Sequence, residues 1–100
     1  MPLQTLFGIV EIPEAGIGSL TVKNLDGANL NNLTRQQYFS GASLTNAPDG
    51  ADYIGVHIPG KATSSAIQVL FQRASTNVYM RRKSANTWSS WFQFTLTEVV

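Results

Sequence analysis

The side chains best suited to bind a ligand lie near the end of the chain, where aromatic rings and cations share one segment. A strand-like run that contains Tyr79 and Arg81 is followed by a polar turn and then by two tryptophans. Flat rings stack on the apolar faces of sugars, while arginine and asparagine supply directional hydrogen bonds to hydroxyl or acidic groups. These residue types predict a glycan-binding patch. The candidate residues are Tyr79, Arg81, Arg82, Asn86 and Trp88.

The same side chains also have structural explanations, which remain open. Arg73 and the run 81–83 hold four of the seven basic residues, and a solvated basic edge discourages strand-to-strand aggregation. Trp91 is followed by Phe92 and Phe94, so we assign it to the core. Alternatively, a neighbouring subunit covers the face that bears these side chains, and the ligand binds at the loop around residues 46–52.

Catalytic groups are scarce. His57 is the single histidine and lies on a predicted strand, where we expect a surface or half-buried position. The sequence contains no Gly-x-Ser-x-Gly, HExxH or phosphate-loop motif. Asp49 lies in a Pro-Asp-Gly turn, where its carboxylate is expected to bond its own backbone, and Asp52 follows closely. We therefore expect no enzyme, no cofactor and no metal site.

Composition excludes several other classes of protein. Apolar residues make up 43% of the chain and charged residues only 13%, which indicates one globular domain with a weakly charged surface. A net charge of +1 is too small for a general nucleic-acid binder. There is no cysteine, no apolar run as long as the ~20 residues of a membrane span, and no signal peptide at the start. We expect neither membrane insertion nor secretion by a leader.

Alternating polar and apolar residues recur along the chain and predict an all-β fold, a small antiparallel sheet with irregular loops. Residues 24–35 are rich in Asn and predict a loop or a short helical piece. A turn over Ser84–Thr87 joins the last two predicted strands. The predicted strands cover residues 6–12, 19–23, 53–58, 66–73, 78–83 and 88–96.

The apolar positions of these alternating runs predict the core. Replacing Val69 with Asp would place an unpaired charge among them and is expected to cost several kcal/mol. The residues expected to be mostly buried are Ile54, Val56, Ile67, Val69, Phe71, Met80 and Phe92.

Residues 1–28 form a turn-rich lead-in that is too short to bury a core of its own. It contains an apolar run, and this run has too few partners within so short a chain. Packing against copies of the same chain would cover it, which suggests a homotrimer. The residues of the run are Leu3, Leu6, Phe7, Ile9 and Val10.

Several short motifs occur in a recognisable order between residues 29 and 95. They are Asn29-Leu30-Asn31-Asn32-Leu33-Thr34, Tyr38, Ala42 through Thr45-Asn46-Ala47-Pro48, Tyr53-Ile54-Gly55-Val56, Ile67-Gln68-Val69, Tyr79-Met80-Arg81 and Trp88-Ser89-Ser90-Trp91. This order resembles the pyocin-knob type domain of bacteriophage tail fibres and R-type pyocin fibres. The family often has Pro-Gly before its Tyr, whereas Arg35-Gln36-Gln37 stand there in this chain.

The resemblance implies a knob-like β domain over residues 29–100, carried on a trimeric fibre with residues 1–28 as an oligomerisation or attachment segment. It also implies a place in the virion, at a tail fibre or tail tip, beside other tail or capsid proteins. The expected function is host-surface recognition, with bacterial surface polysaccharide as the partner. The alternative is a structural virion component, such as a decoration, baseplate or tail-tip protein, without receptor binding.

Overall fold

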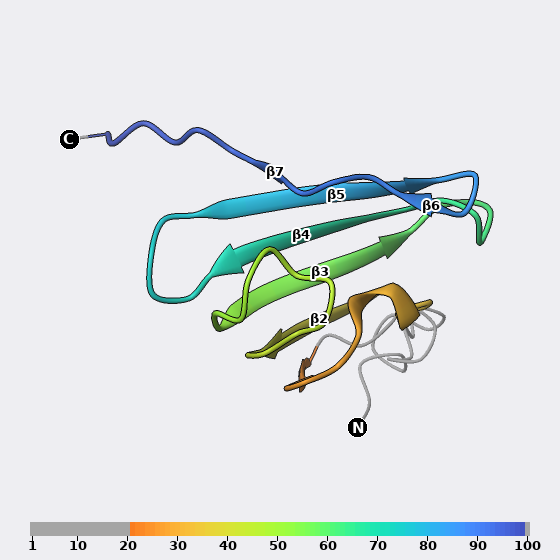
Figure 1. Cartoon of the computed structure of the whole chain (residues 1–100), viewed down its shortest axis with the longest axis horizontal. Coiled ribbons are helices and arrows are strands. Elements are labelled where there is room, and N and C mark those ends of the chain that lie inside the picture. Colours follow the sequence, from red (N-terminus) through yellow and green to blue (C-terminus); the bar gives the residue numbers. More distant parts are fainter. Residues whose placement is uncertain (1–20, 100) are drawn as a thin grey trace, which may run out of the picture.

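The computed structural model describes residues 21–99, and these form strands and loops with one short 3-10 helix. Figure 1 shows the strands side by side in one sheet. The elements are β1 (Val22–Asn24), η2 (Leu30–Asn32), β2 (Gln37–Gly41), β3 (Tyr53–Pro59), β4 (Ala66–Gln72), β5 (Val78–Ser84), β6 (Thr87–Trp88) and β7 (Phe92–Gln93).

The strands follow the order β1-β2-β3-β4-β5-β6, and β7 also pairs with β5. The predicted all-β class is therefore confirmed. All pairs are antiparallel except β1 and β2, which run parallel, so the sheet is mixed rather than purely antiparallel. Alternation did not predict β2, because Gln37, Ser40 and Gly41 interrupt the apolar pattern of this strand.

The three central strands coincide with the predicted runs 53–58, 66–73 and 78–83 within a residue. The predicted strand over 6–12 lies outside the described residues. The expected helical piece within 24–35 is η2, where Asn29 caps the first turn by accepting a hydrogen bond from the Asn31 N–H. The predicted strand over 88–96 is broken into β6 and β7.

The turn between β5 and β6 is the tight two-residue hairpin predicted at Ser84–Thr87. Its central residues, Ala85 and Asn86, have φ angles of 51° and 65°. Positive φ at both positions is typical of a type I′ turn, whose twist matches the twist of the flanking strands. Asn86 tolerates this conformation well, and its N–H donates to the carbonyl of Ser64 in the neighbouring loop.

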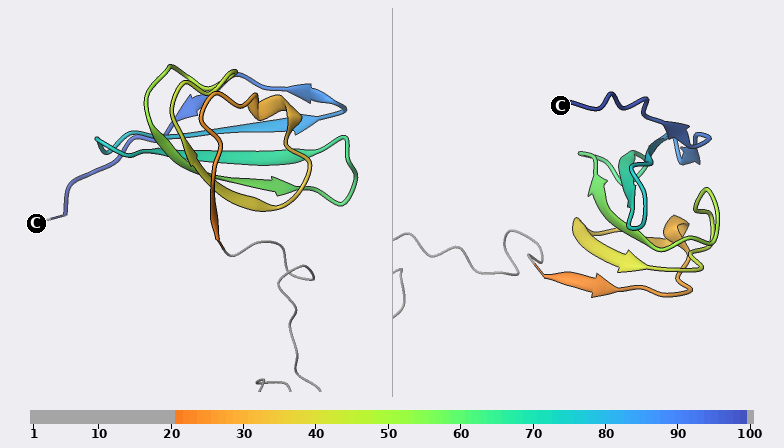
Figure 2. Two further views of the ribbon diagram at one scale, coloured as in Figure 1. Left: turned by 90° about the horizontal axis from the view of Figure 1, so that it is seen from below. Right: turned by 90° about the vertical axis from the view of Figure 1, so that its left-hand side faces the viewer.

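Alternation divides the sheet into two faces, which we call the inner and the outer face. The inner face is covered by η2 and by the loop between β2 and β3, which lie on the concave side of the curved sheet (Figure 2). It contains the buried side chains of the central strands, whereas the outer face has no cover among residues 21–99.

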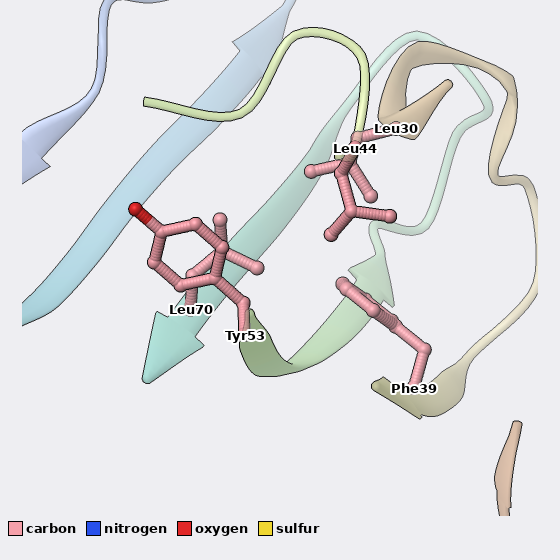
Figure 3. Packing of buried hydrophobic residues seen from close by; sticks show 5 residues of the cluster. All are labelled: Leu30, Phe39, Leu44, Tyr53 and Leu70. Atoms are coloured by element: carbon pink, nitrogen blue, oxygen red, sulfur yellow. The ribbon is translucent and has the colours of Figure 1, made fainter. Parts of the chain in front are cut away.

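The hydrophobic core lies between the inner face and these covering segments. Leu30 of η2 and Leu44 of the β2–β3 loop pack onto residues from three strands (Figure 3). Trp91, which we assigned to the core, is half-buried and packs against this cluster. The five fully or nearly fully buried apolar residues of the cluster are Leu30, Phe39, Leu44, Tyr53 and Leu70.

The predicted core residues belong to the outer face and are not the core, so the prediction is wrong for the four of them that are exposed. Alternation separates the two faces correctly, but it does not say which face the loops cover. The outer face carries more aliphatic side chains, and the inner face is nevertheless buried because Leu30 and Leu44 dock there. Ile54, Ile67, Phe71 and Phe92 are exposed, while Val56, Val69 and Met80 are half-buried. The cost of several kcal/mol expected for Val69→Asp assumed that Val69 is fully buried, but Val69 is only half-buried.

Part of the predicted lead-in contributes to the sheet. β1 pairs with β2, the Leu25 N–H donates to the Ser40 carbonyl, and Ala28 lies against the core. The division after residue 28 stays a prediction, but residues 22–28 are bonded to the strands that follow it.

A glycine on the inner face provides a test of which face is the core. A Cβ atom at Gly55 would lie 2.6 Å from both Leu70 Cδ2 and Phe39 Cζ, whereas a Cβ atom at Gly50 would meet nothing within 4 Å. We expect Gly55→Ala to lower the free energy of unfolding by about 1–3 kcal/mol through overpacking. Gly50→Ala, the matched control, is expected to be neutral. Equal denaturation midpoints for the two variants would contradict this assignment of the core.

Candidate functional site

The inner face contains an unusual row of polar side chains. Gln37 pairs with His57, His57 with Gln68, and Gln68 with Arg81, so that one residue from each of four adjacent strands lies in line. All four are at most 8% exposed. Buried polar groups are costly unless they are hydrogen-bonded, so their partners decide whether this row stabilises the fold.

Gln68 is the centre of this row. Its Nε2 donates to the Leu30 carbonyl at 2.7 Å and lies 3.0 Å from His57 Nδ1, while its Oε1 accepts from Arg81 Nε at 3.0 Å. Arginine can only donate, which fixes the orientation of the amide and leaves both Nε2 hydrogens for Leu30 and His57. The Gln68 side chain thereby joins the helix η2, β3 and β5.

The tautomer of His57 follows from this geometry. Its Nδ1 must accept the hydrogen bond from Gln68, so the neutral ring carries its proton on Nε2. Burial lowers the pKa of His57 below its ordinary value, and the charges of Lys83 and Arg81 lower it further. His57 is thus a buried neutral residue, not the surface or half-buried histidine that we expected.

Arg81 is 4% exposed, and burial lowers the pKa of its guanidinium to about 10. Besides Gln68 it bonds Asn31, through an Nη2–Oδ1 hydrogen bond of 2.8 Å. Its guanidinium carbon lies 4.0 Å from the ring centroid of Trp88 and 4.8 Å from that of Trp91. Two π faces and two amide oxygens therefore compensate for the loss of water around this cation.

The break between β6 and β7 brings both tryptophans to Arg81. Residues three apart on a regular strand would face opposite sides of the sheet. At the break, Ser89 bonds the backbone of Arg82 through its own N–H and its hydroxyl, in place of a continuous ladder. Trp91 Nε1 then donates to the Asn46 carbonyl at 2.7 Å, which fixes the ring over the inner face.

The five candidate glycan-binding residues do not form one patch. Tyr79 and Arg81 lie on the inner face, where Tyr79 packs edge-on against Tyr53 and Arg81 is enclosed. Arg82 is exposed but lies on the opposite face, because adjacent strand residues alternate. Asn86 is exposed at the hairpin turn and Trp88 is half-buried beside it. Only these last two remain together and accessible.

A small recess lies next to this end of the hairpin. Its volume is about 100 Å³, and it is lined by the residues that follow η2, the end of β3, the β3–β4 loop and Lys83. Lys83 connects the recess with Trp88, since its Nζ lies 5.6 Å from that ring centroid. The polar residues of its lining are Thr34, His57, Lys61, Thr63, Ser65 and Lys83.

Sequence reasoning missed most of these recess residues. No sequence pattern gave Thr34 or Lys61 a binding role, because these residues reach the recess only through the folding of their loops. The polar row left a clearer signal, since Gln68 and Arg81 occupy the positions of their strands that share a face with His57. The expectation of a surface or half-buried His57 left that signal unused.

The acidic residues behave as turn and surface residues. Asp49 accepts from the Ala51 N–H, as predicted, and also from the Tyr53 hydroxyl at 2.6 Å. The bond from Tyr53 is the main reason why the pKa of Asp49 is lowered. Asp52 forms an exposed 2.9 Å ion pair with Arg73. Residues 21–99 contain no cluster of three metal-ligating side chains and no helix able to span a membrane.

The buried neutral His57 predicts a pH-dependent stability. In the unfolded chain the imidazole binds a proton below about pH 6.5, whereas the folded protein resists protonation until a lower pH. Its contribution is present above about pH 6.5 and is lost as the pH falls through the folded pKa. We expect the free energy of unfolding to fall as the pH drops below about 6.5, by up to about 1.4 kcal/mol per pH unit. Urea denaturation of the wild type and of His57→Gln measures this slope, and equal slopes would contradict the assignment.

Comparisons with known proteins agree with this architecture. Over 84% of its length the chain superposes on 24% of a solved structure of the P. aeruginosa R1 pyocin fibre comprising C-terminal residues 323-701, with a TM-score of 0.71 and 16% sequence identity. The fold expected from the resemblance to pyocin fibres is thus confirmed, and the chain spans about a quarter of that fibre structure. No curated protein sequence matches significantly. Residues 15–94 match the family described as XkdV N-terminal domain. That match extends over most of the chain, which therefore belongs to the XkdV N-terminal domain family.

Proposed function

We propose that this protein is a component of a bacteriophage tail fibre or a phage-tail-like fibre, and that it takes part in recognition of the bacterial surface. The observation that carries the proposal is the fold shared with a part of the R1 pyocin fibre, at a TM-score of 0.71. Such a component acts in the virion, at a tail fibre or tail tip, and associates with other tail proteins.

The proposed ligand is a surface glycan, and the proposed site is the recess beside the β5–β6 hairpin. Lys61 and Lys83 offer ammonium groups to an acidic or hydroxyl-rich sugar, and Thr34 offers a hydroxyl. Trp88 remains half-exposed at the same end and offers part of its ring for stacking. The volume of about 100 Å³ suits one substituent of a sugar rather than a whole ring.

The proposed activity is binding without catalysis. Glycoside hydrolysis uses two carboxylates placed about 5–10 Å apart around the bond to be cleaved. The lining of the recess contains no Asp or Glu among the described residues. His57 Nδ1 is already engaged by Gln68, so it is not free to act as a base.

We also propose that the working form is a homotrimer. The apolar run at residues 3–10, which lies outside the described residues, first suggested it. Three identical chains around one axis would bury apolar surface that a single small sheet leaves exposed.

A second candidate is a structural virion component, such as a decoration, baseplate or tail-tip protein that binds no receptor. This candidate is favoured by the burial of residues that belong to the motifs resembling pyocin-knob domains. Gln68, Arg81 and Leu30 belong to those motifs and are buried, so these members of the motifs build the fold rather than contact a ligand.

Polysaccharide binding distinguishes the two functions. Surface polysaccharide of a susceptible bacterium is titrated against the wild type, Lys61→Gln, Lys83→Gln and the double variant, with Lys23→Gln as a matched control away from the recess. Loss of a charged hydrogen-bond donor is expected to weaken binding about tenfold or more, without effect in Lys23→Gln. Circular dichroism confirms folding of each variant.

Two outcomes would contradict this proposal at different levels. Unchanged affinity in the double variant would show that the recess is not the glycan site, and the loop of residues 46–52 would then be the next candidate. Absence of binding by the wild type, across polysaccharides from bacteria that the fibre adsorbs to, would favour the structural virion component.

A further inference from the structure

The outer face of the sheet is the largest feature that the proposed glycan site does not use. The strand registers place apolar side chains opposite one another across five strands without interruption. Tyr38 pairs with Val56, Val56 with Val69, Val69 with Met80, and Met80 with Phe92. This row is flanked by Ile54 and Phe71 on one side and by Ile58 and Ile67 on the other.

These side chains are open to solvent in the single chain. The six most exposed of them, Tyr38, Ile54, Ile58, Ile67, Phe71 and Phe92, are between 41% and 59% exposed. Monomeric soluble proteins rarely expose contiguous apolar patches larger than a few hundred Å². The row and its two flanking rows form one continuous apolar surface, which favours a partner that covers it.

The small size of the core also favours such a partner. Among residues 21–99, five large apolar residues are buried between the inner face and its covering segments, and part of that face is occupied by the polar row around Gln68. Apolar burial contributes about 25 cal/mol per Å², so covering the outer face would add to the stability that this core supplies.

Charge on the outer face decides what kind of partner fits. Arg82, at one end of the face opposite Ile67, is the charged side chain among its paired residues. The outer face also bears hydroxyl groups, from Tyr38 in the row and from Ser40 opposite Ile54, but no carboxylate lies among its paired residues. An apolar sheet face of the same composition complements it, and about 800 Å² per partner makes a stable interface of this type.

We propose that other copies of this chain cover the outer face, which is thus the interface of the assembled fibre domain. The inference rests on the proposed fibre function and places the subunit contact on a named surface. The inner face then holds each subunit together, while the outer face holds the subunits to one another. The recess beside Lys61 and Lys83 stays accessible, because it lies on the inner-face side of the sheet.

Light scattering coupled to size exclusion tests the proposal on the full chain. The wild type and Val99→Lys, a matched control in the exposed tail, are expected to elute at a multiple of 10.9 kDa. Ile67→Lys puts the same charge on the outer face at a position that is 41% exposed, where a single chain tolerates it. We expect this variant to fall to the mass of one chain while its circular dichroism spectrum still shows a sheet.

A second measurement covers the case in which Ile67→Lys fails to fold. The chain has no cysteine, so Ile67→Cys and Val99→Cys each introduce a single thiol. We expect a thiol reagent to modify position 99 quickly and position 67 slowly. Equal rates at both positions, or an unchanged mass in folded Ile67→Lys, would overturn the interface without touching glycan binding. A wild type of 10.9 kDa whose position 67 is protected would overturn it in favour of residues 1–20 as the cover.

Discussion

The side-chain amide of Gln68 is the interaction on which the rest of this structure depends. It bonds the carbonyl of Leu30, the ring of His57 and the guanidinium of Arg81, and so joins the short helix η2 to two strands. A buried amide of this kind stabilises only one arrangement of its neighbours, because any shift leaves a polar atom unpaired at a cost of about 1–3 kcal/mol. The residues 21–99 contain no buried side-chain polar atom without a partner.

This network explains why a face with polar residues is the buried one. Once Leu30 is bonded to Gln68, η2 and the β2–β3 loop lie on that side, and Leu44 completes the core there. Arg81 in turn draws Trp88 and Trp91 to the inner face, which requires the break at Ser89. The Trp-Ser-Ser-Trp frame thus serves the fold first, and only the part of Trp88 that remains exposed is available to a ligand.

The sequence predicted what depends on local pattern. Alternation located the three central strands, Pro-Asp-Gly located the Asp49 turn, and the order of short motifs indicated the fold of a pyocin fibre domain. The choice of buried face was not predictable in the same way, because it depends on contacts between residues far apart, such as Leu30 and Gln68 at a separation of 38. The scatter of the glycan candidates has the same cause, since Arg81 and Arg82 are neighbours in sequence but lie on opposite faces.

The two faces consequently have different roles. Several residues of the motifs that resemble fibre domains bond one another on the inner face, among them Asn31, Gln68 and Arg81. Their presence therefore indicates the fold and not a ligand. In the proposed function, specificity for a surface comes from positions outside those motifs, such as Lys61 at the rim of the recess. In the proposed assembly, the aliphatic outer face forms the contact between subunits.

The protonation state of His57 tests the central role of the Gln68 network most directly. Because the chain has a single histidine, nitrogen chemical shifts of its imidazole can be followed by NMR without overlap. The network predicts one neutral tautomer with the proton on Nε2, an Nδ1 that accepts a hydrogen bond, and a pKa below the ordinary value of 6.5. A ring that exchanges between tautomers and titrates at its ordinary pKa would show that His57 faces solvent, and the buried face would then have been assigned incorrectly.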